Sequence, residues 1–277
     1  MEKKKNDFIA QGSILAIASI LVRVMGMIYR IPMTAIIGDK GNGFYSYAYS
    51  VYTILLLLSS YSLPLAVSKM VSAKAQLGQW RNVKRVFICA IAFAIGIGTT
   101  FGLTVLIGAQ FFTRVFFHSE LAAIALRFMA PTILIMALLG VFRGFFQGLQ
   151  NTLPTAVSQI VEGLINAIMS VVFAYFLFDF GHGMDVASGT TDLGYAWGAA
   201  GGAIGTGAGA LAGLIFCFIL FVAYRKILAV NISRDKTGTQ QEYGDIFRLM
   251  LSIALPVILS TALYNLIELV DGSLFNN

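Results

Sequence analysis

The segment GSILAIASILVRVMGMIYRIPMT (residues 12–34) has the length and composition of a membrane-crossing helix, but it carries Arg23 and Arg30. A helix of about 20 mainly apolar residues crosses the hydrocarbon core of a bilayer. On an insertion scale a central arginine costs roughly 2.5–3.5 kcal/mol, whereas each Ile, Leu or Val contributes about 0.3–0.6 kcal/mol in favour of insertion. Residues 14–37 contain eleven Ile, Leu and Val residues, which together favour insertion by about 5 kcal/mol. This free energy is comparable with the cost of two central arginines, so the helix can only just insert.

The two arginines lie seven residues apart, which places them on one face of a helix. Long cationic side chains can snorkel to the lipid headgroups, and this explanation suits Arg30, which precedes Pro32, better than Arg23. Charges inside a membrane usually face a polar cavity or a partner. We therefore expect Arg23, and Arg30 with it, to face a cavity.

The whole chain has the composition of an integral membrane protein. It is 58% hydrophobic and 12% charged, against about 25% charged in an average soluble domain. Its apolar runs are continuous rather than alternating, which favours helices over a β-barrel. We expect an all-α membrane protein with Cys89 and Cys217 as buried core residues. The expected spans are 9–37, 43–68, 86–112, 121–146, 154–179, 194–224 and 247–274.

The basic residues predict how the chain is oriented. We assign fourteen of the 19 Lys and Arg residues to the N-terminal side and four to the opposite side, with Arg23 within the membrane. Positive charge concentrates in cytoplasmic loops, so we expect a cytoplasmic N-terminus and an external C-terminus. The net charge of +6 therefore indicates membrane orientation and not nucleic acid as a partner. Three segments are expected: a six-helix lobe (1–227), a cytoplasmic linker (228–246) and one further helix (247–277).

Further polar residues stand within the apolar runs. Gln159, Glu162 and Asn166 follow at i, i+3 and i+7, on one helical face. This stripe suits a packing network, proton coupling or balance of the arginine charges, and the sequence leaves these open. Glu268 in the last span is a further candidate for a cavity. No residue pattern indicates a metal or another cofactor.

The sixth span is rich in glycine, with Gly201, Gly205, Gly209 and Gly213 spaced four residues apart. Small residues at this spacing let helix backbones approach closely in membranes. The alternative, a dinucleotide-binding loop, requires a different glycine spacing and a preceding strand. We therefore expect tight helix packing at this span.

The stretch GVFRGFFQGLQNTLPTAVSQIVEGLIN (140–166) resembles a hallmark of the multidrug/oligosaccharidyl-lipid/polysaccharide (MOP) flippase superfamily. The shared pattern is an Arg-Gly pair, Gln-Gly, a polar turn, a proline, Ser-Gln and a carboxylate. Residues 62–87 also resemble this superfamily, and the opening helix is similar to that of its bacterial polysaccharide transporter branch. Within that branch, the likeness is to the stage V sporulation protein B and lipid II flippase groups.

The resemblance implies two six-helix lobes around a cavity, which opens alternately to the two sides of the bacterial cytoplasmic membrane. This chain would supply the first lobe and the opening helix of the second, as a fragment or truncated reading frame. In lipid II flippases, arginines of the first helix line the cavity and meet the lipid pyrophosphate. Arg23 and Arg30 match these positions, so the resemblance implies that they bind an undecaprenyl-pyrophosphate-linked saccharide. The basic residue expected in the second helix is absent from residues 54–66.

The expected activity is therefore transport of lipid II or a polysaccharide precursor, without enzymatic chemistry. The driving force is left open between a coupling ion (H⁺ or Na⁺) and the membrane potential. One alternative is a cation-coupled multidrug exporter, for which a carboxylate-rich cavity would be expected. Another is a membrane assembly or sporulation scaffold, which leaves Arg23 unexplained. We expect Glu162 to be more dispensable for transport than Arg23.

The orientation can be tested by cysteine labelling. A cysteine at Ser188, in a loop without Lys or Arg, should react with a membrane-impermeant reagent applied to intact cells, whereas one at Thr237 should not. Labelling at Thr237 with protection at Ser188 would reverse the predicted orientation.

Overall fold

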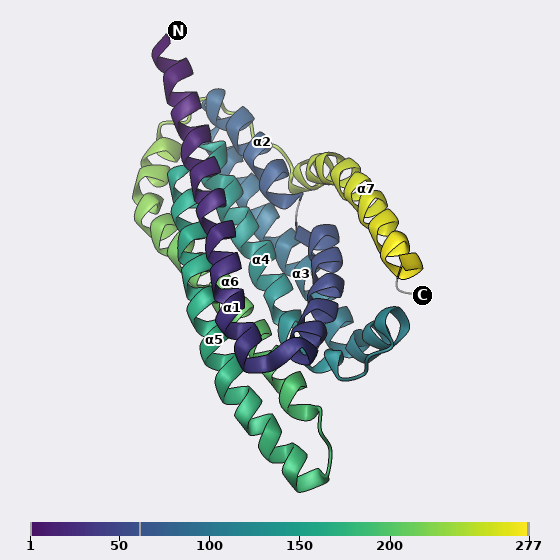
Figure 1. Cartoon of the computed structure of the whole chain (residues 1–277). Helices are drawn as coiled ribbons and strands as arrows, with labels where there is room; N and C mark the ends of the chain where they lie inside the picture. Colours follow the sequence, from purple (N-terminus) through teal and green to yellow (C-terminus); the bar gives the residue numbers. More distant parts are fainter. Residues whose placement is uncertain (1, 61, 276–277) are drawn as a thin grey trace.

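The computed structural model describes the backbone of residues 2–60 and 62–275 and the side chains of residues 12–57, 59 and 62–260. Its elements are α1 (Glu2–Ser60), α2 (Leu63–Gln76), α3 (Trp80–Phe117), α4 (Ala122–Gly148), α5 (Leu153–Ser188), α6 (Leu193–Ser233) and α7 (Tyr243–Phe275), as Figure 1 shows. In the described residues, all of these helices except α2 are long and apolar enough to cross a membrane. The all-α expectation is confirmed.

The boundary between the first two expected spans is confirmed. Two helical halves of α1 meet at a kink at Gly38, whose φ of 62° lies in the left-handed region that glycine adopts most readily. The apolar part of α1, 46 residues long, would measure about 70 Å if straight, more than twice the roughly 30 Å hydrocarbon core. The bend lets the two halves run back alongside each other (Figure 1).

The expectation of one uninterrupted span over 43–68 is wrong. Its residues are divided between the second half of α1 and the start of α2. A proline in the first turn of α2 explains why a new helix begins there, because proline fits the first turn and cannot continue a preceding helix.

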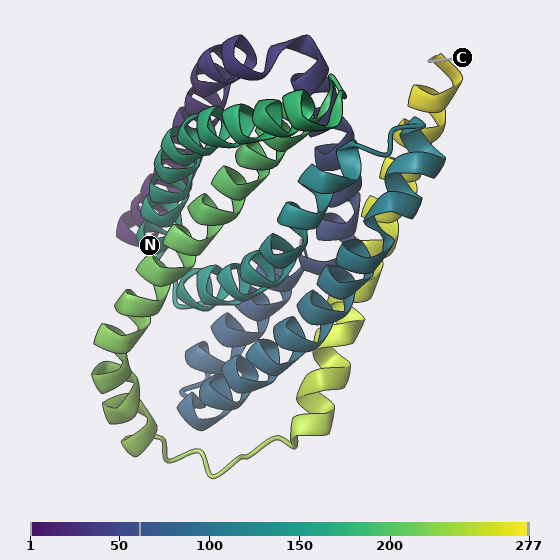
Figure 2. The same ribbon diagram turned by 90° about the horizontal axis from the view of Figure 1, so that it is seen from below.

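Helices α5 and α6 pack against each other along much of their length (Figure 2). A Cβ atom at Gly201 would come within 2.4 Å of the backbone of Phe173 and Ala174. One at Gly205 would lie 2.2 Å from Ser170 Oγ. The glycine-rich span therefore brings two backbones together, as the sequence predicts.

Helix α4 lies within the bundle and packs against α1, α2, α3 and α6. Aromatic rings of three helices meet on one side of it, where Phe87 stacks on Phe221 at 4.5 Å and lies 4.9 Å from Phe145. Cys89 and Cys217 are buried free thiols, as expected of core residues. Helix α4 therefore has a fixed position relative to its neighbours.

At the end that holds the N-terminus, residues 234–242 connect α6 to α7 and are bound to the start of α3 (Figure 1). Asp235 accepts a hydrogen bond of 2.9 Å from the backbone N–H of Arg81, and Gln241 N–H donates to Asn82 Oδ1 at 3.0 Å. The Arg81 N–H and the bonds from Thr237 lower the pKa of Asp235 to about 2. This non-helical connection is shorter than the predicted linker, and the division into lobe, linker and following helix stays a prediction.

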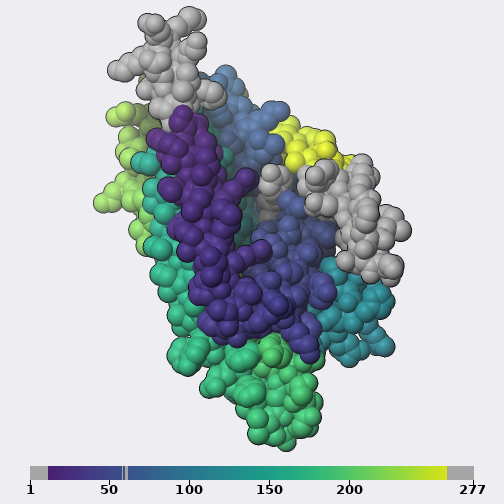
Figure 3. All heavy atoms as spheres, viewed as in Figure 1, coloured from purple at the N-terminus to yellow at the C-terminus, as the bar shows by residue number. Residues whose placement is uncertain are grey.

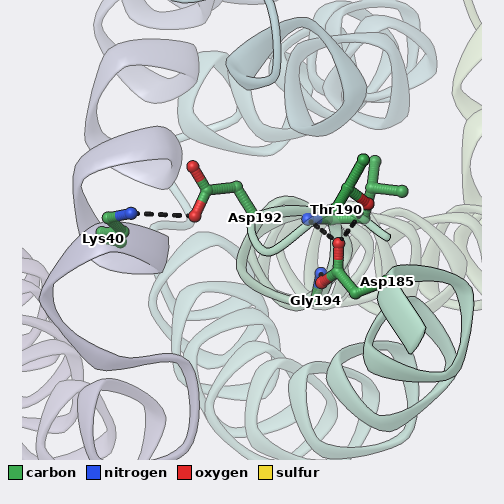
Figure 4. Close-up of polar contacts among 6 residues, drawn as sticks. Lys40, Asp185, Thr190, Asp192 and Gly194 are labelled. Atoms are coloured by element: carbon green, nitrogen blue, oxygen red, sulfur yellow. Dashed lines mark hydrogen bonds and ion pairs between the residues drawn. The ribbon is translucent and has the colours of Figure 1, made fainter. Parts of the chain in front are cut away.

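The other end of the bundle is held by two carboxylates (Figure 4). Asp185 of α5 accepts hydrogen bonds from Gly194 N–H at 2.8 Å and Leu193 N–H at 3.0 Å, at the start of α6. Lys40, two residues after the bend of α1, forms an ion pair of 2.8 Å with Asp192. The bend and the α5–α6 connection are therefore joined at this end.

The packing account can be tested at Gly205. We expect Gly205→Ala to destabilise the protein by about 1–3 kcal/mol, because the added methyl group must displace the Ser170 backbone. Unfolding in detergent would measure this. The control is Gly183→Ala in α5, where no atom lies within 4 Å of the added Cβ. Equal stabilities of the two variants would contradict close backbone packing.

Candidate functional site

The first half of α1 packs against α5 through one face. Ala18 and Met33 are buried, and the side chains of Val22 and Met25 lie against Gly163 of α5. A Cβ atom at Gly163 would meet Met25 Cε at 3.1 Å. This contact fixes the rotation of α1 and hence the direction of its other faces.

Beside this face runs a polar stripe, defined as Ser19, Arg23, Gly26, Arg30 and Thr34. The spacing of three and four residues places its members on one side of the helix. The surface on the other side is made of exposed apolar side chains: Ile17, Ile20, Val24, Ile28 and Ile31. The arginines are thus directed away from the surface best suited to lipid.

Arg23 and Arg30 are exposed, and no hydrogen bond or ion pair holds either guanidinium among the described side chains. Figure 3 shows a hollow between the two halves of α1, with side chains of the first half protruding over it. The candidate Glu268 lies outside the residues whose side chains are described. The structure therefore leaves two cationic groups available to a ligand on this side of the bundle.

A third arginine, Arg143 of α4, has partners within the bundle. Its Nη2 lies 2.7 Å from Glu162 Oε2, and its Nε donates to Ser158 Oγ at 2.8 Å. The Arg143 and Glu162 side chains are only 11% and 24% exposed. Removing one partner of such a pair costs about 3–5 kcal/mol, because the other charge stays buried.

Sequence reasoning missed Arg143 as a site residue and assigned it to the basic residues at the helix ends. Helix α4 instead continues to Gly148, so thirteen basic residues rather than fourteen remain on the N-terminal side, and the charge asymmetry is preserved. Arg143 and Glu162 both lie within about three helical turns of the hairpin between α4 and α5. Opposite charges at such positions were a signal for their pairing.

The three residues of the predicted stripe on α5 lie in different environments. Glu162 pairs with Arg143, which supports charge balance, although its partner is neither Arg23 nor Arg30. Asn166 Oδ1 accepts a hydrogen bond of 2.8 Å from Ser170 and lies against α6, as a packing residue would. Gln159 Oε1 is buried and has no hydrogen-bond partner among the residues that the structure describes. The functional roles of these residues stay predictions.

The ion pair and the polar stripe share neighbours. Tyr49 in the second half of α1 lies within electrostatic range of both Arg30 and Glu162, and Tyr52 lies within range of Glu162. On the side of α6, Cys217 lies beside Ser158. The stripe and the ion pair are therefore parts of one polar region, which is bordered by α1, α4, α5 and α6.

Comparison with known sequences identifies the family. The sequence profile of the family described as "Polysaccharide biosynthesis protein" matches residues 8–276. Stage V sporulation protein B of Bacillus subtilis (strain 168) is 26% identical over 266 residues, which are 95% of this chain and 48% of that protein. Lipid II flippase MurJ of the same organism is 25% identical over 267 residues, 92% of this chain and 47% of that protein. The chain thus spans about half the length of the curated relatives it matches.

Solved structures share the fold. An outward-facing multidrug resistance transporter of the MATE family in the MOP superfamily gives a TM-score of 0.65 at 16% identity, over 90% of this chain and 52% of that chain. A MOP superfamily transporter from Pyrococcus furiosus gives 0.62 at 17% identity with the same coverage. The predicted fold class is confirmed, with the chain covering about half of a MOP-type fold. The chain belongs to the family described as "Polysaccharide biosynthesis protein", and its fold is that of about half of a MOP superfamily transporter.

Proposed function

We propose that the protein moves an undecaprenyl-pyrophosphate-linked saccharide across the bacterial cytoplasmic membrane by alternating access. The observation that carries this proposal is the polar stripe of α1, where Arg23 and Arg30 lie exposed and unpaired among the described side chains. The family and the flippase named among its relatives support the same class of cargo. The glycan could be that of lipid II or of another polysaccharide precursor.

The chemistry of the stripe suits a pyrophosphate. Such a headgroup cannot cross hydrocarbon unaided, because the desolvation of its charges is too costly. A guanidinium is permanently charged and presents a planar fork that matches phosphate oxygens. Arg23 and Arg30 are about 10 Å apart along the helix axis, and their long side chains can converge on one headgroup. The stripe can therefore replace part of the hydration that the headgroup loses.

The charge of the polar region argues against a drug exporter that carries cations. Glu162 is the carboxylate placed beside the stripe, and Arg143 neutralises it. The unpaired charges that remain there among the described side chains are those of two arginines. A non-transporting scaffold would leave these two charges without a role. An anionic cargo accounts for both.

The proposal predicts the behaviour of Arg23 variants. Arg23→Ala should insert at least as well as the parent, because the cost of a central arginine is removed. It should bind undecaprenyl pyrophosphate about 10- to 100-fold more weakly, the effect of losing a charge-assisted hydrogen bond of about 1.5–3 kcal/mol. Arg23→Lys should restore part of the affinity, and Arg30→Ala should weaken it in the same direction. The measurement is the Kd of protein purified in lipid nanodiscs.

The matched control is Arg114→Ala, which removes an exposed arginine near the far end of α3, 3.6 Å from Glu120. Its affinity should equal that of the parent. A lipophilic cation in place of the pyrophosphate lipid tests the exporter alternative. Normal expression of Arg23→Ala with unchanged affinity and transport would contradict the proposed function, as would tight binding of the cation alone.

A further inference from the structure

We propose that Arg143 is a positioning residue that holds the Glu162 carboxylate and cancels its charge, so that Arg23 and Arg30 stay available to an anionic headgroup. This inference rests on the proposed function and concerns the same polar region. It gives a role to an arginine that lies in a different helix from the polar stripe.

The guanidinium of Arg143 is held at two points, one of which is the Glu162 carboxylate. Arg143 reaches Glu162 with Nη2 at 2.7 Å and Ser158 with Nε at 2.8 Å, so the plane of the guanidinium is held at two points. The Ser158 hydroxyl also donates to Thr155 O at 2.7 Å. Because its proton is used there, a lone pair of Ser158 remains to accept from Arg143. The arginine is therefore oriented before any ligand arrives.

Helix α6 packs closely against the backbone and Cβ of Glu162 and so limits the movement of this residue. A Cβ atom at Gly209 would come within 2.6 Å of the Glu162 carbonyl oxygen, and one at Gly213 would lie 3.5 Å from Glu162 Cβ. Helices α4 and α5 make little direct contact with each other, since α6 packs against both. The long Arg143 side chain bridges this separation and carries a charge to the carboxylate.

The other groups around Glu162 cannot replace Arg143. Helices α1 and α6 pack against α5, and α4 reaches it mainly through the Arg143 side chain. Among the described side chains, those within electrostatic range of Glu162 are Tyr49 and Tyr52 of α1, Arg143 of α4 and Cys217 of α6, and Tyr49 is also within range of Arg30 of α1. The tyrosines and the cysteine are ordinarily neutral at pH 7. Without Arg143, the next cation in this set is Arg30, which would then be drawn to Glu162 instead of to a phosphate.

The inference is tested by a charge-swap series. Arg143→Gln should weaken binding of undecaprenyl pyrophosphate about tenfold or more, as truncation of one partner of a desolvated charge pair does. Glu162→Gln should bind at least as tightly as the parent, because it removes a negative charge. The double variant Arg143→Gln/Glu162→Gln should regain an affinity within about threefold of the parent, because no unpaired carboxylate remains.

A lipid without phosphate separates charge from structure. Binding of undecaprenol, which has no phosphate, should be the same in all variants.

The matched control is Gln147→Ala, one turn further along α4. Gln147 also links α4 to α5, through a hydrogen bond of 3.3 Å to Thr155, but it carries no charge. Its affinity for the pyrophosphate lipid should match that of the parent. If Arg143→Gln does not fold, Arg143→Lys loses the guanidinium fork but keeps the positive charge that cancels Glu162, and it should bind within about threefold of the parent.

Three results would overturn the inference. One is an unchanged affinity of Arg143→Gln. Another is an affinity that is equally low in Arg143→Gln and in the double variant. The third is a tenfold loss in Arg143→Lys. If the parent did not bind undecaprenyl pyrophosphate, or if Arg23→Ala bound it as tightly as the parent, the proposed function would be contradicted instead. These outcomes differ from the results that overturn the inference about Arg143.

Discussion

A charge placed in hydrocarbon is stable only when it has a partner or reaches water, and this constraint organises the polar region of the protein. The chain satisfies it in two ways. Arg143 is withdrawn into the bundle and forms an ion pair with Glu162 at 2.7 Å. Arg23 and Arg30 are left exposed on the polar stripe of α1. We propose that the ion pair with Arg143 keeps Glu162 from attracting Arg23 and Arg30, and that these two arginines bind the cargo.

Close helix packing gives these charges their positions. The glycines of α6 let α5 approach to backbone contact, and the same approach fixes the height and rotation of Glu162. Gly163 then receives Val22 and Met25, which sets the rotation of α1 and the direction of its polar stripe. At the far end, the ion pair between Lys40 and Asp192 joins the bend of α1 to α6 (Figure 4). The site is thus built from contacts between helices that are far apart in the sequence.

The sequence was sufficient for the parts of this account that depend on composition and periodicity. It predicted the helical membrane class, the family and the close packing at Gly205. It also predicted the boundary at Gly38, but not the break between α1 and α2, because the apolar pattern continues across that break. It placed Arg143 at a helix end. The opposite charge of Glu162 across the α4–α5 hairpin was a signal for pairing, but periodicity along one helix does not show which side chain Arg143 meets. The orientation in the membrane and the roles of Gln159, Asn166 and Glu268 stay predictions.

The central claim is that the polar stripe of α1 faces water and an anionic headgroup. Cysteine accessibility tests it most directly, in a chain whose buried Cys89 and Cys217 are replaced by alanine. Cysteines at Ser19 and Thr34, in the stripe, should react with a polar thiol reagent and be protected by undecaprenyl pyrophosphate. A cysteine at Ile28, on the apolar side, should not react. Reaction at Ile28 but not in the stripe, or reaction in the stripe without protection by the pyrophosphate lipid, would contradict the account.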